Sequence, residues 1–267
     1  AKIVADSLGT NHTEIVVEED DFFKAIPEVI YKIESFDTTT VRASVGNYLV
    51  AKYIKEHSNA KVIFNGDGSD EISGGYMYFH AAPSPTDFDF ECRRLIDEIH
   101  YFDVLRSDRS ISTNGLEART PFLDIGWVQF YLSIPKEIRC HNINKKCEKY
   151  LIREAFNDDT WLPKDILFRT KEAFSDGVSS QSRSWFEIIN DNVQNIWDLK
   201  ESDYLFKYYK NKHMPPQTLE QLYYRDLFDK AYPNMDRTIP HFWMPNFVDA
   251  KDSSARTLDL YKEKKSN

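Results

Sequence analysis

The sequence contains little cysteine and no long apolar run. Only three of its 267 residues are cysteines, Cys92, Cys140 and Cys147, and no two of them form a CxxC pair. An odd number of isolated cysteines argues against a disulfide framework and favours reduced thiols in a cytoplasmic protein. No apolar stretch approaches the ~20 residues that a membrane-spanning helix needs, so we expect no membrane segment.

Clustered positive charge is also scarce. The net charge is −9, and lysine and arginine form only short runs, such as those at 145–146 and 262–265. A nucleic-acid-binding protein usually presents a basic stripe, so the sequence argues against a nucleic-acid partner. The acidic balance by itself does not select a fold.

Glycine is scarce but concentrated. Four of the nine glycines fall within residues 66–75, where NGDGSDEISGG follows the apolar run VIF. Ligands of α/β proteins bind at the carboxyl ends of strands, and glycine lets the backbone approach a phosphate closely. The acids Asp67, Asp70 and Glu71 repel a phosphate unless Mg²⁺ or a cationic side chain lies between. The stretch therefore predicts a nucleotide–metal or proton-handling site, with a helix-capping turn as the plain alternative. It matches neither GxxxxGK[ST] nor GxGxxG.

Hydrophobic periodicity predicts a helix-rich α/β chain with strands over 12–17 and 61–65 of a parallel sheet. Two parallel strands cannot form a sheet covered on both faces, and the chain begins inside a helical pattern. We therefore expect an incomplete sheet, with further βα units upstream of Ala1. We expect one domain over 1–248 and a loosely held polar tail over 249–267. The predicted helices are Asp20–Ser35, Thr38–Glu56, Pro85–Arg109, a helix capped by Asp124 and ending at Leu132, Glu148–Phe156, Trp185–Val193 and Leu219–Ala231.

Two further stretches combine charge with apolar residues. Within residues 102–109, Asp103 and Arg106 are three positions apart on one helix face, which suits a site pair or a surface ion pair. Residues 115–124, GLEARTPFLD, suit a site segment or a structural salt bridge followed by a helix cap. Spacing alone leaves both alternatives open.

A third stretch, residues 168–177, carries Arg169 and Lys171 among aromatic residues. This arrangement is typical of a phosphate clamp, because cations held beside apolar side chains bind anions well. A solvated loop is the alternative interpretation.

Taken together, these stretches resemble the synthetase domain of the eukaryotic-type, glutamine-hydrolysing asparagine synthetases. Any one segment is a weak signal, but six occur in the family's order. The resemblance extends from Ala1 to about Leu260. The segments are TTVRASVG, NGDGSDEISGGYMYFHAAPSP, YFDVLRSDRSISTNGLEARTPFLD, EKYLIREAF, KEAFSDGVSS and FWMPNFVDAKDSSART.

The resemblance implies an ATP-pyrophosphatase fold and a carbon–nitrogen ligase that uses ATP and Mg²⁺. The side-chain carboxylate of aspartate would be activated as β-aspartyl-AMP, and ammonia would then displace AMP. Glutamine would supply the ammonia through a separate N-terminal domain. The implied site residues are Asn65 and Gly66 against ATP, Asp67 at the adenylate, Asp70 at Mg²⁺–pyrophosphate or aspartate, Asp103 and Arg106 on the aspartate side, and Lys171 at the phosphates.

The sequence departs from the family in two respects. The family has Ser-Gly-Glu where this chain has Asn65-Gly66-Asp67, and the aspartate reaches roughly 1 Å less far, enough to cost about a hundredfold in rate. The family's SGG-x-D-S pyrophosphate loop and the cysteine nucleophile of its glutaminase domain do not occur in this sequence. We therefore expect residues 1–267 alone to be inactive.

Two other hypotheses remain. A degenerate, non-catalytic subunit could bind nucleotide or act as an interaction module, with Asp67 as a mark of drift. Another adenylating enzyme of the superfamily, such as a β-lactam synthetase, fits the YFHAAP and TTVRASVG segments less well. The expected partners are ATP, aspartate and ammonia, together with a second copy of the chain or the N-terminal region of the same protein.

Overall fold

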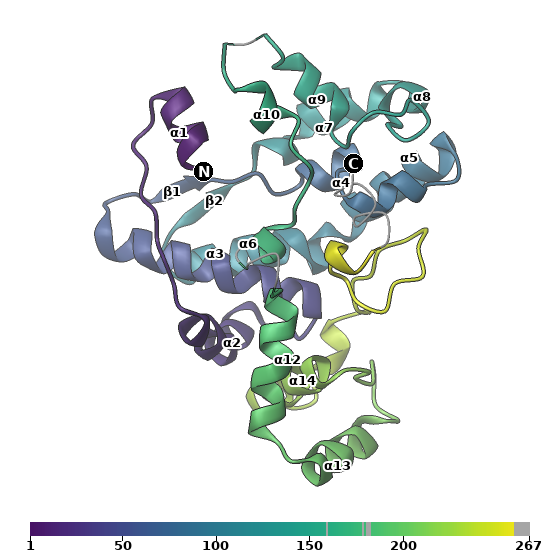
Figure 1. The fold of residues 1–267 in the computed structure, drawn as a ribbon. Coiled ribbons are helices and arrows are strands. Elements are labelled where there is room, and N and C mark those ends of the chain that lie inside the picture. The colour runs from purple at the N-terminus through teal and green to yellow at the C-terminus, as the bar shows by residue number, and fades with distance from the viewer. Residues whose placement is uncertain (159, 178, 180–182, 259–267) are drawn as a thin grey trace.

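The computed structural model describes residues 1–158, 160–177, 179 and 183–258. Most of its elements are helices (Figure 1). The α-helices are α1 (Lys2–Leu8), α2 (Glu19–Ile33), α3 (Thr38–His57), α4 (Ser69–Ser73), α5 (Pro85–Glu98), α6 (Asp103–Ser112), α7 (Ile125–Ser133), α8 (Lys136–Arg139), α9 (Tyr150–Ala155), α10 (Lys164–Leu167), α11 (Phe174–Gly177), α12 (Trp185–Ile196), α13 (Leu199–Tyr209) and α14 (Leu219–Ala231). The 3₁₀ helices are η1 (Met77–Ala81), η2 (Ile99–Tyr101), η3 (Pro121–Leu123), η4 (Asp236–Thr238) and η5 (Ala255–Thr257).

A parallel pair of strands forms the sheet of the described chain. Strand β1 (Val62–Phe64) pairs with β2 (Glu117–Arg119), with Ile63 opposite Ala118. The strand predicted over 61–65 is thus confirmed in its centre, whereas β2 was not predicted as a strand. The strand predicted over 12–17 is wrong, because these residues pair with no strand in the described chain and so lack the ladder that holds a strand extended.

Helices α3 and α6 pack together beside the sheet (Figure 1). Helix α3 begins where Asp37 accepts a hydrogen bond from the Thr40 amide at 2.8 Å, a regular N-cap. Ala51 of α3 and Ile111 of α6 are buried against Leu116 and the partly buried Ile63 of β1. Burial of these apolar side chains fixes the sheet on the two helices.

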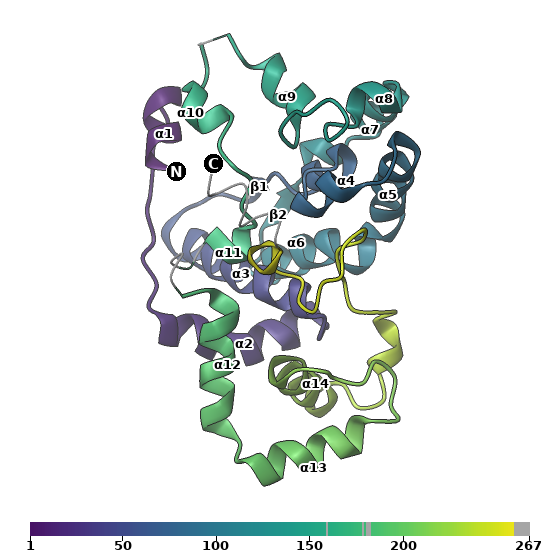
Figure 2. The ribbon, with the colours of Figure 1, turned by 45° about the vertical axis from the view of Figure 1, so that its right-hand side comes forward.

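A second core lies on the other side of α3, where α2, α12 and α14 meet (Figure 2). Its members include Ile30 of α2, Val45 of α3, Ile189 of α12 and Phe228 of α14, all fully buried. Helix α14 begins and ends at the predicted residues, and its N-cap Thr218 accepts a hydrogen bond from the amide of residue 221.

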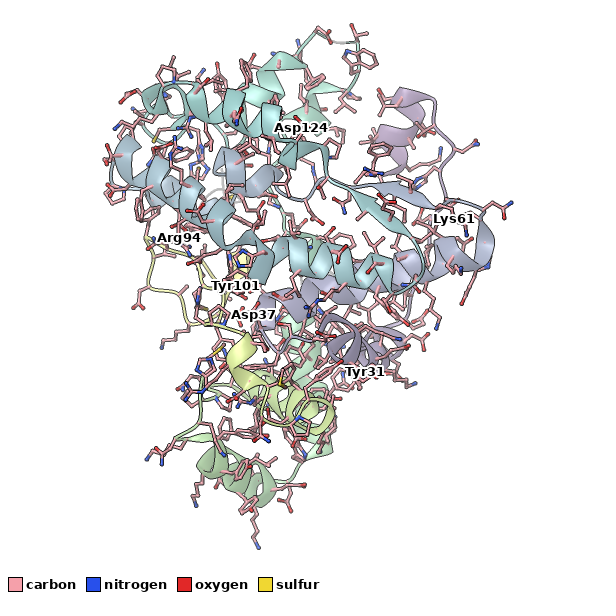
Figure 3. The ribbon with its side chains drawn as sticks, turned by 180° about the vertical axis from the view of Figure 1, so that it is seen from behind. Tyr31, Asp37, Lys61, Arg94, Tyr101 and Asp124 are labelled. Carbon is pink, nitrogen blue, oxygen red and sulfur yellow. The ribbon has the colours of Figure 1, made fainter. Side chains whose placement is uncertain are left out.

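A third core joins the segment after β1 to the C-terminal part of the chain. Phe79 of η1 and Phe88 of α5 are buried with Trp243. The backbone N–H of Trp243 donates to the buried Asp37 at 2.8 Å, so the cap of α3 also holds a residue 206 positions away. Figure 3 shows Asp37 between the helices around the sheet and the C-terminal helix α14.

Two other expectations need correction. The helix predicted over 85–109 is interrupted by η2 and Phe102, whose φ of −126° and ψ of −93° are not helical. This turn lets α6 begin at Asp103 in a new direction. The part of the predicted loose tail over 249–258 is anchored, because Asp252 bonds to the buried Arg42 and Leu258 is buried. Residues 259–267 of that tail, and positions 178 and 180 of KEAFSDGVSS, lie outside the described residues.

Candidate functional site

The loop that follows β1 leaves the sheet at its carboxyl end. The Asn65 amide continues the ladder by donating to the Arg119 carbonyl at 3.0 Å, and the Asn65 side chain accepts from the Asp67 amide at 3.2 Å. Gly68 has a φ of +87° and presses against Leu123, so a side chain at this position would be strained. Helix α4 that follows spans only five residues. Any charge that binds an anion here must therefore come from side chains.

Two lysines from distant loops supply that charge at Asp70. Lys149 Nζ lies 2.9 Å from one carboxylate oxygen of Asp70, and Lys171 Nζ lies 3.2 Å from the other. Lys149 also donates to Ser69 Oγ at 3.0 Å. Burial alone would raise the pKa of Asp70, but the charges of Lys171 and Lys149 outweigh it and lower the pKa to about 2. The trio carries a net charge of +1 at neutral pH.

Gly75 makes this contact between distant segments sterically feasible. A Cβ atom on Gly75 would overlap the carboxylate of Asp70 and would stand 2.5 Å from Cε of Lys149. The second glycine of the pair GG is thus required for close approach rather than for a special φ. Lys149 itself adopts a left-handed conformation with a φ of 59°, which is uncommon for a lysine.

A second charged group lies on α6. Arg106 Nε donates to Asp103 at 3.0 Å, and its Nη2 lies 3.3 Å from Asp67 Oδ1. Burial would raise the pKa of Asp103, yet the charge of Arg106 lowers it below its usual value. The side chains of these three residues are 10–17% exposed, so the ion pairs are partly shielded from water. The structure brings together Asp67, Asp103 and Arg106.

A buried acid and a tyrosine connect the two charged groups. Glu71 is only 2% exposed. The hydroxyl of Tyr76 donates to Glu71 and also lies 3.4 Å from Asp103 Oδ2. Burial and then the charge of Asp103 raise the pKa of Glu71 well above its ordinary value, so the fold favours the protonated form of this acid. The Lys171 ammonium lies 5.9 Å from the Tyr76 ring centroid, within cation–π range.

The two remaining predicted site residues lie at the start of the same loop. Asn65 donates through Nδ2 to Ser107 Oγ of α6 at 2.6 Å, and Gly66 is exposed with no heavy atom within 4 Å of where its Cβ would stand. Arg169, the other cation of the expected clamp, is exposed, and its carbonyl accepts a hydrogen bond from Arg153.

Sequence reasoning missed Lys149, Glu71 and Tyr76 as site residues. Lys149 lies in the EKYLIREAF segment, where nothing local distinguishes it from Lys145 or Lys146. Its role depends on a contact with residues about 80 positions earlier. Glu71 lies within NGDGSDEISGG, but the sequence does not show that its side chain is buried.

A protein-built metal site is absent from the described part of the chain. It contains no group of three or more histidine, cysteine, aspartate and glutamate side chains placed to hold an ion. Both oxygens of Asp70 face ammonium groups, which compete with a metal ion for them. These residues therefore do not fit a Mg²⁺ ion held by the protein alone.

The fold and the site define a class: a helix-rich α/β protein with a cluster of lysine, arginine and acidic side chains where a parallel strand ends. A family model described as asparagine synthase matches residues 1–91 and 83–248. The chain belongs to the asparagine synthase family. Its helices and two-stranded parallel sheet confirm the predicted fold class, part of an ATP-pyrophosphatase domain.

Relatives in three vertebrates carry the name asparagine synthetase [glutamine-hydrolyzing]. Those of Gallus gallus, Rattus norvegicus and Homo sapiens are 48%, 46% and 45% identical to this chain. Each match extends over 263 residues, which is 98% of this chain and 46% of the relative. The chain thus spans about half the length of the curated relatives that it matches.

Proposed function

We propose that this chain forms the synthetase part of an enzyme that makes asparagine from aspartate, ATP and ammonia. Aspartate attacks the α-phosphorus of ATP through its side-chain carboxylate, which forms β-aspartyl-AMP and releases pyrophosphate. Ammonia then attacks the activated carbonyl, gives up a proton and displaces AMP. The names of the relatives support this reaction and support glutamine as the source of the ammonia.

One observation carries the proposal: Lys149 and Lys171 converge on Asp70 beside the glycine-rich loop. Acyl adenylation moves negative charge onto the leaving pyrophosphate, and fixed cations lower the energy of that charge. Asp70 holds the two ammonium groups together without cancelling them. We assign to this trio the role of binding the phosphates.

The other site residues suit the binding of ATP and aspartate and the attack of ammonia. Gly66 and Asn65 leave the loop backbone open for the close approach of ATP. Arg106 and its partner Asp103 would bind the ends of aspartate, since a guanidinium matches a carboxylate and a carboxylate matches an ammonium group. Asp67, in contact with the same arginine, would accept the proton that ammonia must lose, because ammonium is not a nucleophile.

Mg²⁺ enters the proposal as a companion of ATP. Mg²⁺ keeps several waters and binds through substrate phosphates as readily as through carboxylates. We therefore route no step through a metal held by Asp70. This revises the role expected for Asp70 from a metal organiser to a residue that orients two lysines.

Location and partners remain proposals. Three cysteines that form no disulfide in the described chain suit the reducing cytoplasm. In the part of the chain that the structure describes, no helix is long and apolar enough to cross a membrane. A second copy of the chain, or an N-terminal region of the same protein, stays a prediction. The non-catalytic alternative is not favoured, because the ion pairs around Asp67, Asp70 and Arg106 are all in place.

The test uses the complete protein that contains this chain. With ATP, aspartate and ammonium as substrates, Lys171→Ala should lower pyrophosphate release and asparagine formation by roughly a hundredfold, as expected for loss of a charge aimed at the transition state. The matched control is Lys207→Ala, an exposed lysine of α13, which should keep wild-type rates. Equal rates for Lys171→Ala and the wild type would refute the role of the lysine pair. A wild type without asparagine formation would refute the reaction.

A further inference from the structure

The two lysines of the site depend on one buried acid that is not part of it. Glu148 is 1% exposed and immediately precedes Lys149. Its Oε1 accepts a hydrogen bond from the backbone N–H of Lys171 at 2.8 Å. The Glu148 carboxylate thus accepts a hydrogen bond from the backbone of Lys171, and Glu148 is also the sequence neighbour of Lys149.

Arg153 completes this connection. Its Nη2 donates to Glu148 Oε1 at 3.0 Å, and its Nη1 donates to the carbonyls of Leu167 at 2.7 Å and of Arg169 at 2.8 Å. The backbone between α10 and α11 has no helix or strand of its own at 168–173. The loop that carries Lys171 is therefore held at three points by Glu148 and Arg153.

The second carboxylate oxygen of Glu148 has a partner as well. This Oε2 lies 3.3 Å from Nε2 of His80 in η1, the helix that follows the glycine-rich loop. Glu148 therefore contacts three segments at once: η1, the last turn of α9 and the loop before α11. Lys149 sits at this junction in its left-handed conformation, with its carbonyl accepting from the Arg153 amide at 3.0 Å.

We infer that Glu148 is a positioning residue, which with Arg153 sets the spacing of the Lys149 and Lys171 ammonium groups for binding a phosphate or pyrophosphate. The inference rests on the proposed function for the lysines as phosphate-binding groups, and it assigns the control of their geometry to a residue that does not touch the substrate. Lysine is a flexible point charge, so its placement depends on the backbone that carries it.

The structure also explains why this arrangement needs a carboxylate. Glu148 accepts from the amide of Lys171 and from a guanidinium through the same oxygen, and a buried donor left without an acceptor is costly. Loss of the carboxylate removes the bond to the backbone of Lys171 itself, one of the three that hold this loop. It also leaves the Arg153 charge without its buried partner. The backbone positions of Lys149 and Lys171 are then no longer fixed relative to each other by one side chain.

The experiment measures binding of inorganic pyrophosphate to the complete protein by titration calorimetry, without turnover. Glu148→Ala should weaken pyrophosphate binding by about tenfold, because the Lys171 amide and the Arg153 guanidinium lose a buried acceptor and the lysines lose their spacing. Glu148→Gln keeps an acceptor for the Lys171 amide and should recover most of the affinity. The matched control Glu154→Ala removes an exposed acid from α9, the helix that follows Glu148, and should bind like the wild type.

A second variant keeps the test decisive if Glu148→Ala does not fold. Arg153→Lys retains the charge beside Glu148 but loses the fork that reaches the two loop carbonyls, so it should also weaken pyrophosphate binding. A purely structural role would lower only the fraction of protein that binds, with the dissociation constant unchanged, and this result would overturn the inference. If the variants bind pyrophosphate more weakly than the wild type, but the wild type forms no asparagine, the inference is supported and the proposed reaction is refuted.

Discussion

Asp70 and Glu71 are neighbours in the sequence, yet their surroundings move their pKa values in opposite directions. Asp70 faces two ammonium groups, which lower its pKa to about 2. Glu71 faces the interior, where burial and the nearby Asp103 raise its pKa well above the ordinary value. Helix α4 therefore presents one acid whose ionised form is favoured and one whose protonated form is favoured, which is how a site separates a charge-holding role from a proton-holding role.

Replacement of Glu71 by glutamine tests its protonation. A raised pKa means that the folded protein binds this proton more tightly than the unfolded chain does. Wild-type stability should therefore fall as the pH rises from the unfolded pKa near 4.5 toward the folded pKa, by up to about tenfold in the unfolding equilibrium per pH unit. Glu71→Gln has no proton to lose, so its stability relative to the wild type should increase with pH over this window.

The measurement is the denaturant midpoint of both proteins between pH 5 and pH 8, a range that lies above the titration of ordinary carboxyl groups. Glu137→Gln, at an exposed acid of α8, serves as the control and should follow the wild type. A constant difference between Glu71→Gln and the wild type across this range would show that Glu71 does not hold a proton.

At the scale of elements, local signals predicted helices better than strands. Helices α3 and α14 begin next to capping residues, Asp37 and Thr218, so their starts could be predicted from the sequence. Strand β2 consists of Glu-Ala-Arg with two exposed charged side chains. Its extended form comes from pairing with β1, more than 50 positions earlier, and such pairing leaves no local pattern in three residues.

The candidate site follows the same rule. The sequence indicated Asp67, Asp70, Asp103, Arg106 and Lys171, because each lies in a segment that resembles the family. The convergence of Lys171 on Asp70, 101 positions away, and the participation of Lys149 required the folded chain. The deeper burial that makes the pKa of Glu71 differ from that of Asp70 likewise depends on the packing around it.

The turn between α4 and η1 carries a prediction at this scale. Gly75→Ala should destabilise the protein by about 1–3 kcal/mol, because the added methyl group overlaps Asp70 and crowds Lys149. The control is Gly66→Ala, which meets no atom within 4 Å and should leave the denaturant midpoint unchanged. If the two variants unfold at the same denaturant concentration, the close approach at Gly75 does not constrain the turn.

At the scale of the whole molecule, buried Arg42 ties the C-terminal segment to the rest of the fold. It donates to Glu220 through Nε at 2.8 Å and to both oxygens of Asp252 at 2.8 Å. Burial would lower the pKa of Arg42, but the two carboxylates outweigh it, so the arginine stays charged. Asp37 adds a second tie through the backbone of Trp243.

Asp252→Ala should therefore lower the stability of the protein by about 1–3 kcal/mol, since it leaves a buried guanidinium with one partner fewer. The denaturant midpoint measures the change, and Asp249→Ala, at an exposed position of the same segment, is the matched control. Equal midpoints for the two variants would mean that the segment adds no stability through Arg42.

The bonds of Arg42 also have a consequence for the order in which the protein is made. Its partners lie 178 and 210 positions later in the chain. At the usual ~5–20 residues per second, synthesis of the 210 positions from Arg42 to Asp252 takes roughly 10–40 s. Until that interval ends, the Arg42 guanidinium of α3 lacks at least one of its two carboxylate partners. The full set of ion pairs around Arg42 can therefore form only after the C-terminal segment has left the ribosome.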